Sequence, residues 1–394
     1  YVNCIAGRQW SLPPLNVCYY SNNDPMGFKR KRIILHVGLH KTGTTAIQQT
    51  LAASNKLLQN QGWKYPVFTD GVRNRIVNHS NPLYTLFCDN PGGYLPNLTV
   101  GIDGELARQC FARQLEEELK GEFNLIFSGE DVSSLPEAAL KKLAEALSGH
   151  ELLVIAVVRE TYSTFVSTLQ HRIHRGVHGL RLEVPSLWEN CARLARVFPD
   201  LRFLSYEKAC LAPGGLFSTF MEECGFDPKP FSVSRENVSI GNHTARFLAS
   251  FNDYYPLIVN GGLNSRRPQF NVYDLDFDDA KFLLTEAEFS IIDDRVRAEN
   301  ERLSEVTGLT FRFSDNQAFS DSSPISAALA ALLLEKAALM PSALINHGFR
   351  YISEHDLASE VWRVIRPFPP VTRGLPRFWR LDKIFQPRAR VGEF

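Results

Sequence analysis

A glycine- and threonine-rich loop around Lys41 combines residue types that bind phosphate. It follows the apolar run RIILHVG (32–38) and begins a helical stretch, 44–62. Its glycines let the backbone turn tightly, and the backbone amides at the start of a helix point toward an anion. The lysine adds a mobile positive charge, and the threonines add hydroxyl groups. The predicted anion-binding residues are Lys41, Thr42, Gly43, Thr44 and Thr45.

The position of the lysine distinguishes this loop from the common nucleotide P-loop. In the P-loop pattern GxxxxGK[ST], the lysine directly follows the last glycine. Here Thr44 follows Gly43, and Lys41 lies two residues before that glycine. The sequence therefore lacks the Lys-Ser/Thr pair that accompanies Mg²⁺-nucleotide binding, and we expect no metal at this loop.

A second set of polar residues follows the apolar run LLVIAVV (152–158). Arg159 ends that run, and Ser167 lies eight residues further on. Steps of four residues keep side chains on one face of a helix, so Ser163, Ser167 and His171 form a column with Arg159. An arginine fork beside hydroxyl groups is suited to a phosphate monoester.

These two motifs, in this order, resemble the nucleotide-binding motifs of sulfotransferases that use 3′-phosphoadenosine 5′-phosphosulfate (PAPS). The resemblance covers roughly residues 30–310. It implies that PAPS is the sulfuryl donor, that Lys41 contacts the oxygen between sulfur and phosphorus, and that the following amides hold the 5′-phosphate. It further implies that Arg159 and Ser167 bind the 3′-phosphate.

Two further segments are similar to parts of that family. SYEKACL (205–211) resembles a Tyr-Glu segment whose tyrosine contacts adenine, which implies that role for Tyr206; an ordinary core tyrosine is the alternative. RENVSIGNHTARFLASFN (235–252) resembles a loop-to-helix segment in which Arg235 and Ser239 help to close over the nucleotide. A helix N-cap explains Ser239 equally well.

Sulfuryl transfer also needs a base for the proton of the acceptor. Glu130 follows the strand-like run NLIFSG (124–129), and its SGE context resembles glycosaminoglycan N-sulfotransferases and tyrosylprotein sulfotransferases, which use a glutamate. The Thr-His segment of the cytosolic small-molecule members is not found. We therefore predict Glu130 as the base, with Asp131, His40 and His171 as reserves. The alternative for Glu130 is capping of the next turn or pairing with a loop cation.

Apolar runs of strand length alternate with amphipathic helical stretches along this region. This alternation predicts an α/β fold with a P-loop-like parallel sheet flanked by helices on both faces. Ligands of such sheets bind beyond the carboxyl ends of the strands, where the motifs above lie. The predicted strands are 32–38, 124–129, 152–158 and 202–206, and the predicted helices are 44–62, 136–149, 160–175 and 216–226.

Beyond this region the sequence predicts a small helical C-terminal extension, with helices at 325–340 and 353–366. The expected domains are a leader or non-native extension (1–25), a catalytic domain (26–313), a linker (314–324) and the extension with its basic, aromatic tail (325–394). The tail is a candidate site for an anionic ligand; the alternative is a proline-rich arm packed on the catalytic domain.

Composition narrows the class of protein. Forty-three basic residues balance 43 acidic ones, which argues against a dedicated nucleic-acid binder. The scattered cysteines favour neither a zinc site nor a disulfide framework, and His171, His174 and His178 have no carboxylate at ligand spacing. These histidines are instead candidates to line an acceptor cleft.

The sequence contains no predicted transmembrane segment, because the longest apolar stretch near the C-terminus (325–340) is interrupted by charges. We expect a cytoplasmic protein. A Golgi-lumen enzyme is the alternative, because the chain has four glycosylation sequons: Asn78, Asn97, Asn237 and Asn242.

Taken together, the sequence predicts a PAPS-dependent sulfotransferase that transfers a sulfuryl group by in-line displacement. The expected partner is a small-molecule or glycan acceptor with a hydroxyl or amine group, such as a carbohydrate, a lipid or another metabolite. Two alternatives stay open: an ATP-dependent P-loop phosphotransferase, and a non-catalytic adaptor that keeps the nucleotide fold and binds anionic polymers.

Overall fold

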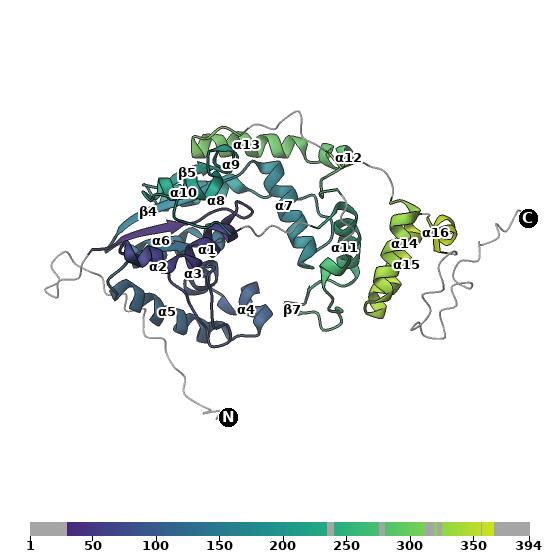
Figure 1. The fold of residues 1–394 in the computed structure, drawn as a ribbon, viewed down its shortest axis with the longest axis horizontal. Helices are drawn as coiled ribbons and strands as arrows, with labels where there is room; N and C mark the ends of the chain where they lie inside the picture. The colour runs from purple at the N-terminus through teal and green to yellow at the C-terminus, as the bar shows by residue number, and fades with distance from the viewer. Residues whose placement is uncertain are drawn as a thin grey trace, which may run out of the picture. The chain divides into compact units, whose positions relative to one another are not determined.

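Five strands form a parallel sheet in the order β2-β3-β1-β4-β5. Figure 1 labels β4 and β5 of this sheet. The computed structural model describes residues 30–234, 240–275, 280–311, 319–320, 325–355 and 357–365. The strands are β1 (Arg32–His36), β2 (Trp63–Lys64), β3 (Asn124–Ser128), β4 (Glu151–Val158) and β5 (Arg202–Ser205). The fold class predicted from the sequence is confirmed.

Both faces of this sheet are buried. In the central strand β1, Ile33 and Leu35 belong to one apolar cluster and Ile34 to another, and each is at most 1% exposed. Successive side chains of a strand point to opposite faces, so a sheet covered on both sides needs apolar residues at every position. This requirement explains why the strands read as continuous apolar runs.

Helices supply the apolar residues that cover each face of the sheet. One face packs against α1 (Thr44–Ala53), α2 (Asn55–Asn60) and α10 (Gly215–Glu223). The opposite face packs against α3 (Ser80–Phe87), α5 (Gly104–Lys120), α6 (Glu137–Leu147) and α8 (Leu187–Val197). Shorter elements complete this part: η1 (Pro91–Gly93), α4 (Leu95–Val100), η2 (Glu130–Ser134) and α9 (Tyr206–Leu211).

The chain divides into two compact units, and each has its own core. The first unit contains the sheet and comprises 1–160, 186–236 and 299–311; the second comprises 161–185, 237–298 and 312–394. The elements assigned wholly to the second unit are α7 (Thr161–His174), α11 (Asn242–Tyr254), β6 (Ile258–Val259), β7 (Gly262–Leu263), η3 (Val272–Leu275), α12 (Glu286–Ser290), α14 (Ala327–Ala338), α15 (Ser342–Glu354) and α16 (Ala358–Ile365). The boundary between 298 and 299 divides α13 (Asp293–Thr307).

The four predicted strands are all present, and the structure adds the short edge strand β2. The predicted helix 44–62 is broken at Ser54, and its last residues lead into β2. Near the C-terminus, the predicted helix 353–366 corresponds to α16, whereas α15, which precedes it, was not predicted. Helices α5 and α13, which the alternation of strands and helices did not predict, are among the longest described.

Several predicted features lie outside the described residues. They are the segment 1–25, the residues Arg235 and Ser239, the sequon at Asn237, the tail beyond 365 and most of the expected linker 314–324. Within that linker the structure describes 319–320, where the backbone N–H of Ser320 donates to the carbonyl of Leu284 at 2.9 Å. Within the described residues, none of the helices combines the length and apolar character needed to cross a membrane.

Candidate active site

The loop after β1 has the backbone geometry of an anion-binding turn. Lys41 and Gly43 both adopt left-handed conformations, with φ angles of 66° and 77°. A lysine in this region costs about 1–3 kcal/mol relative to an ordinary conformation, so the surrounding structure must hold it there. Gly43 then begins α1, whose first backbone amides are not used within the helix.

Contacts within the loop fix its shape. The hydroxyl of Thr42 donates to the carbonyl of Leu39 at 2.6 Å and lies 3.5 Å from the hydroxyl of Thr44. Both threonines are buried, whereas Thr45 is exposed and Lys41 is half-buried. Thr42 therefore contributes its side chain to the fold of the loop, while its backbone lies at the helix start.

The two loop glycines have little room for a side chain. A Cβ atom at Gly43 would lie 2.4 Å from the side chain of Leu216, in addition to the cost of its positive φ. A Cβ atom at Gly38 would lie 2.6 Å from the imidazole of His36. Close packing around the loop thus requires glycine at both positions.

Arg159 connects the second predicted motif to the loop. Its guanidinium donates to the carbonyl of Lys41 at 3.0 Å and lies 4.7 Å from the centroid of the Tyr206 ring. Burial raises the pKa of Tyr206, although the positive charge of Arg159 opposes that shift. Three predicted site residues are therefore in contact at the carboxyl edge of the sheet.

A carboxylate that was not predicted holds the start of this arginine segment. Glu207 accepts a hydrogen bond from the backbone N–H of Glu160 at 2.9 Å, and Asn300 donates to the carboxylate of Glu160 at 2.9 Å. Glu207 belongs to the same Tyr-Glu pair as Tyr206. One dipeptide thus contacts the Arg159 side chain and fixes the backbone beside it.

Glu130 lies at the beginning of η2 and is held by two neutral amides. Gln48 donates to one carboxylate oxygen at 3.1 Å, and Asn78 donates to the other at 3.2 Å. Gln48 lies on α1, four residues after Thr44, so it joins the carboxylate to the helix that the loop begins. The alternative of a loop cation paired with Glu130 finds no support in the described residues.

The reserve Asp131 is paired. It accepts a hydrogen bond from the hydroxyl of Tyr94, and the imidazole of His40 lies 3.1 Å from its carboxylate. Burial alone would raise the pKa of Asp131, but the contacts with His40 and Tyr94 outweigh it and lower the pKa. A carboxylate with a lowered pKa is a weaker base, which argues against Asp131 in this role.

A buried network of hydrogen bonds lies at the ends of β1 and β3, next to the loop and Glu130. The Nδ1 atom of His36 lies 2.8 Å from the hydroxyl of Ser128, and the backbone N–H of Ser128 donates to Nδ1 of His79 at 2.9 Å. The Nε2 atom of His36 has no hydrogen-bond partner. Burial lowers the pKa of His36 to about 3 and that of His79 to about 4, so both rings are neutral near pH 7.

Ser167 and the reserve His171 lie on α7 and belong to the second unit. Ser163 and Ser167 are half-buried and His171 is exposed, whereas Phe165 and Leu169 on the same helix are buried. The predicted serine column is thus on the polar side of a real helix. Because Arg159 belongs to the first unit, its pairing with Ser167 stays a prediction.

Besides Glu207, sequence reasoning missed Gln48 and Asn78. Gln48 is 2% exposed and shares the inward face of α1 with Ile47 and Leu51. A glutamine inside an otherwise apolar helix face needs a hydrogen-bond partner, and that requirement is a usable sequence signal. Asn78 belongs to an irregular segment and has no comparable pattern.

The name polar edge is used below for the loop 38–45 together with Glu130, Arg159 and Tyr206. It contains a lysine, an arginine, an aromatic ring and a carboxylate at the carboxyl ends of parallel strands. A scan against protein-family models and a search of curated proteins found no match to this chain. The arrangement of these residues is therefore the basis for a functional proposal.

Proposed function

We propose that the protein is a sulfotransferase that moves the sulfuryl group of PAPS to a hydroxyl or amine group of an acceptor. The observation that supports this most is the contact of Arg159 with both the Lys41 loop and Tyr206. It joins the two motifs that resemble the 5′- and 3′-phosphate sites, in a loop that lacks the lysine of a Mg-ATP P-loop. An arginine, a tyrosine ring and a turn of amides suit an adenosine with phosphates at both ends.

Each group then has a role in an in-line displacement. The amides at the start of α1 hold the 5′-phosphate, and the Lys41 ammonium stabilises negative charge on the oxygen that bridges phosphorus and sulfur. The acceptor oxygen or nitrogen attacks sulfur, the new bond to sulfur forms, and the bond to the bridging oxygen breaks. The leaving group is 3′,5′-adenosine bisphosphate.

Glu130 accepts the proton that the acceptor loses. Its two oxygens are oriented by Gln48 and Asn78, which are neutral donors and leave the negative charge available. Asp131, in contrast, is already paired with His40. The proposal needs no metal, and the acceptor class is a carbohydrate, a lipid or another metabolite.

The deciding experiment is a calorimetric titration of the full chain with 3′,5′-adenosine bisphosphate, with 5′-AMP and with Mg-ATP. We expect tight binding of the bisphosphate and much weaker binding of the other two. A preference for Mg-ATP would replace the proposal with a phosphotransferase, and no binding of any nucleotide would overturn it.

A second measurement separates an enzyme from a nucleotide-binding adaptor. PAPS is offered with a panel of carbohydrate, lipid and amine acceptors, and release of 3′,5′-adenosine bisphosphate is followed. Lys41→Ala is expected to reduce turnover by about 10²–10³-fold, the cost of removing one donor to a developing charge. Bisphosphate binding without turnover on any acceptor would favour the adaptor.

The proposal keeps the cytoplasmic location expected from the sequence. Asn97 is fully buried and its amide donates to Thr85 and Pro91, and Asn242 is 7% exposed. The amide of Asn78 donates to Glu130. A glycan attached at these sequons would disrupt the described contacts, so they lend little support to the Golgi-lumen alternative.

A further inference from the structure

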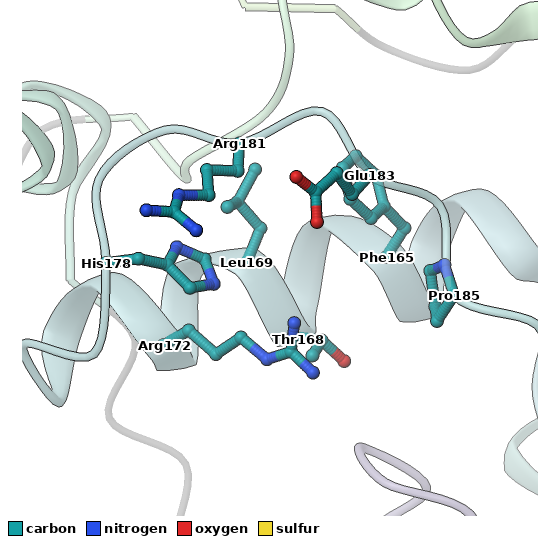
Figure 2. Close-up of a pocket in the computed structure, with 8 residues that line it drawn as sticks. All are labelled: Phe165, Thr168, Leu169, Arg172, His178, Arg181, Glu183 and Pro185. Carbon is teal, nitrogen blue, oxygen red and sulfur yellow. The ribbon is translucent and has the colours of Figure 1, made fainter. Parts of the chain in front are cut away.

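A small basic pocket lies in the second unit, and none of the polar-edge residues lines it. Figure 2 shows that Arg172 comes from α7, whereas His178 and Arg181 come from the segment that follows this helix. Thr168, one turn before Arg172, adds a hydroxyl to the lining. The name basic pocket is used for the hollow lined by Thr168, Arg172, His178 and Arg181.

The backbone that presents these side chains is well held. After α7, the N–H of Val177 donates to the carbonyl of Arg172 at 2.9 Å, across the left-handed Gly176. The buried amide of Asn252 donates to the carbonyls of Ile173 at 2.8 Å and His178 at 3.1 Å. The turn that brings His178 back toward α7 is therefore fixed by hydrogen bonds to α11.

The histidine of the pocket has an assigned tautomer. Its Nδ1 atom lies 2.7 Å from the carbonyl oxygen of Gly179. A carbonyl only accepts, so Nδ1 carries a proton and donates. The other ring nitrogen, Nε2, is then a hydrogen-bond acceptor, so the donors that the pocket offers to an anion are the two arginines and Thr168.

The two arginines of the pocket differ from Arg246 and Arg267 of the same unit. Arg246 forms an ion pair with Glu288, and Arg267 donates to Asn252. Within the part of the chain that the structure describes, Arg172 and Arg181 have no ion pair or side-chain hydrogen bond, with Glu183 at the rim or with any other residue. Two exposed arginines thus line one hollow, and the exposed carboxylate of Glu183, which lines the same hollow, pairs with neither of them.

The floor and the size of the pocket restrict its ligand. Phe165 and Leu169, which are 3% and 2% exposed, form an apolar floor that strengthens electrostatic attraction above it. The cavity volume is about 20 Å³, slightly more than the roughly 10–15 Å³ that one water needs. That space suits a single small group and not a whole sugar ring.

We propose that the basic pocket binds one carboxylate or sulfate group of an acidic carbohydrate acceptor. The arginine forks and the Thr168 hydroxyl match the oxygens of such a group. This inference rests on the proposed function in one respect only, namely that the bound carbohydrate is the acceptor. It makes the acceptor an acidic glycan and excludes a neutral lipid.

The test is direct binding by the full chain, without PAPS. The probe is an unsulfated oligosaccharide of alternating glucuronic acid and N-acetylglucosamine, compared with its carboxyl-reduced form and with inorganic sulfate. Arg172→Ala/Arg181→Ala is expected to weaken binding of the acidic oligosaccharide by about 10–100-fold, the loss of hydrogen bonds between charged groups. The carboxyl-reduced oligosaccharide is expected to bind weakly to the wild type and the variant alike.

A matched control removes the same charge elsewhere in the second unit. Arg266 and Arg295 are exposed and have no side-chain partner, so Arg266→Ala/Arg295→Ala should keep the wild-type affinity within about twofold. Glu183→Gln removes the acidic side chain at the rim and should increase the affinity about two- to fivefold. A gain of affinity cannot result from misfolding.

Each contrary outcome has a definite meaning. Equal binding by wild type and the pocket variant, an equal loss in the control variant, or no binding of the acidic oligosaccharide would overturn the inference. Arginine-dependent binding of inorganic sulfate alone would overturn the carbohydrate assignment. The adenosine bisphosphate titration is expected to be the same in the pocket variant and the wild type. Its failure in the wild type would remove the proposed function while the pocket result stands.

Discussion

The arginines of the polar edge in the first unit and of the basic pocket in the second unit differ in whether their side chains have interaction partners. At the polar edge, Arg159 donates to the Lys41 carbonyl and stacks on Tyr206. In the basic pocket, Arg172 and Arg181 have no ion pair or side-chain hydrogen bond with the residues that the structure describes. At the polar edge the arginine has its contacts before any ligand binds. In the basic pocket we expect the arginines to gain a partner only when an anion binds.

This difference indicates what each region contributes. Groups that are already oriented lose little entropy on binding and suit a reaction that needs atoms in line. Unpaired guanidinium groups attract an anion strongly but orient it less, which suits recognition of one substituent on a larger molecule. We therefore expect substitutions at the polar edge to change turnover, and substitutions in the basic pocket to change affinity for the acceptor.

The largest expected effect tests whether the polar edge determines turnover. Glu130→Gln should reduce turnover of PAPS by about 10²–10⁴-fold, because a general base is lost, while the affinity for 3′,5′-adenosine bisphosphate is retained. Turnover and calorimetry are measured on the same preparation. The control is Glu145→Gln on the exposed side of α6, which should have no effect. Unchanged turnover in Glu130→Gln would move the search for the base to Asp131 or His171.

Arg159→Ala tests whether the Arg159 guanidinium binds the 3′-phosphate of the nucleotide. Affinity for 3′,5′-adenosine bisphosphate should fall about 10–100-fold, whereas affinity for 5′-AMP should fall much less. Arg159→Lys retains the charge without the fork and should recover only part of the loss. An equal loss for both nucleotides would mean that Arg159 supports the loop and does not bind the 3′-phosphate.

The buried histidine beneath the loop predicts a dependence of stability on pH. The pKa of His36 is about 3 in the folded chain against 6.5 as the ordinary value. Below pH 6.5 the unfolded chain therefore binds a proton that the folded chain does not, and stability falls as the pH falls. The loss from His36 should be about 2 kcal/mol between pH 7 and pH 5.

The contribution of His36 is measured by denaturant unfolding of the wild type and of His36→Gln at pH 7 and at pH 5. The variant should lose about 2 kcal/mol less than the wild type over the same interval. Comparison of slopes removes any change in stability that the substitution causes at neutral pH. Equal slopes in the two proteins would show that His36 is not held neutral by the fold.

The smallest expected effect concerns the amide that orients Glu130. Gln48→Leu should lower kcat about tenfold, as expected for one lost hydrogen bond to a charged group, without a change in nucleotide affinity. The control is Gln49→Leu, one residue further along α1, where the glutamine has no side-chain partner. A change in nucleotide affinity, or an equal effect in the control, would contradict an orienting role for Gln48.

Sequence reasoning was sufficient for features that depend on neighbouring residues. The strands and the glycine-threonine loop are visible in the sequence because apolar runs and turn residues are local patterns. The contact of Lys41 with Arg159 could be anticipated only in outline, since two parallel strands end at the same edge. The left-handed conformation of Lys41 is not encoded in a local pattern. For Gln48 the apolar helix face signals only that a partner is needed, and the partner, Glu130, is distant in the sequence.

The central position of β1 has a consequence for synthesis of the chain. This strand is made first, yet its neighbours are β3 and β4, which end at Ser128 and Val158. At about 5–20 residues per second, the ribosome needs roughly 6–24 s between the end of β1 and the end of β4. Both hydrogen-bonding edges of this apolar strand lack their partners until β3 is complete, and one edge lacks its partner until β4 is complete. The nascent chain should therefore be a strong chaperone client, although the finished sheet buries the same strand almost completely.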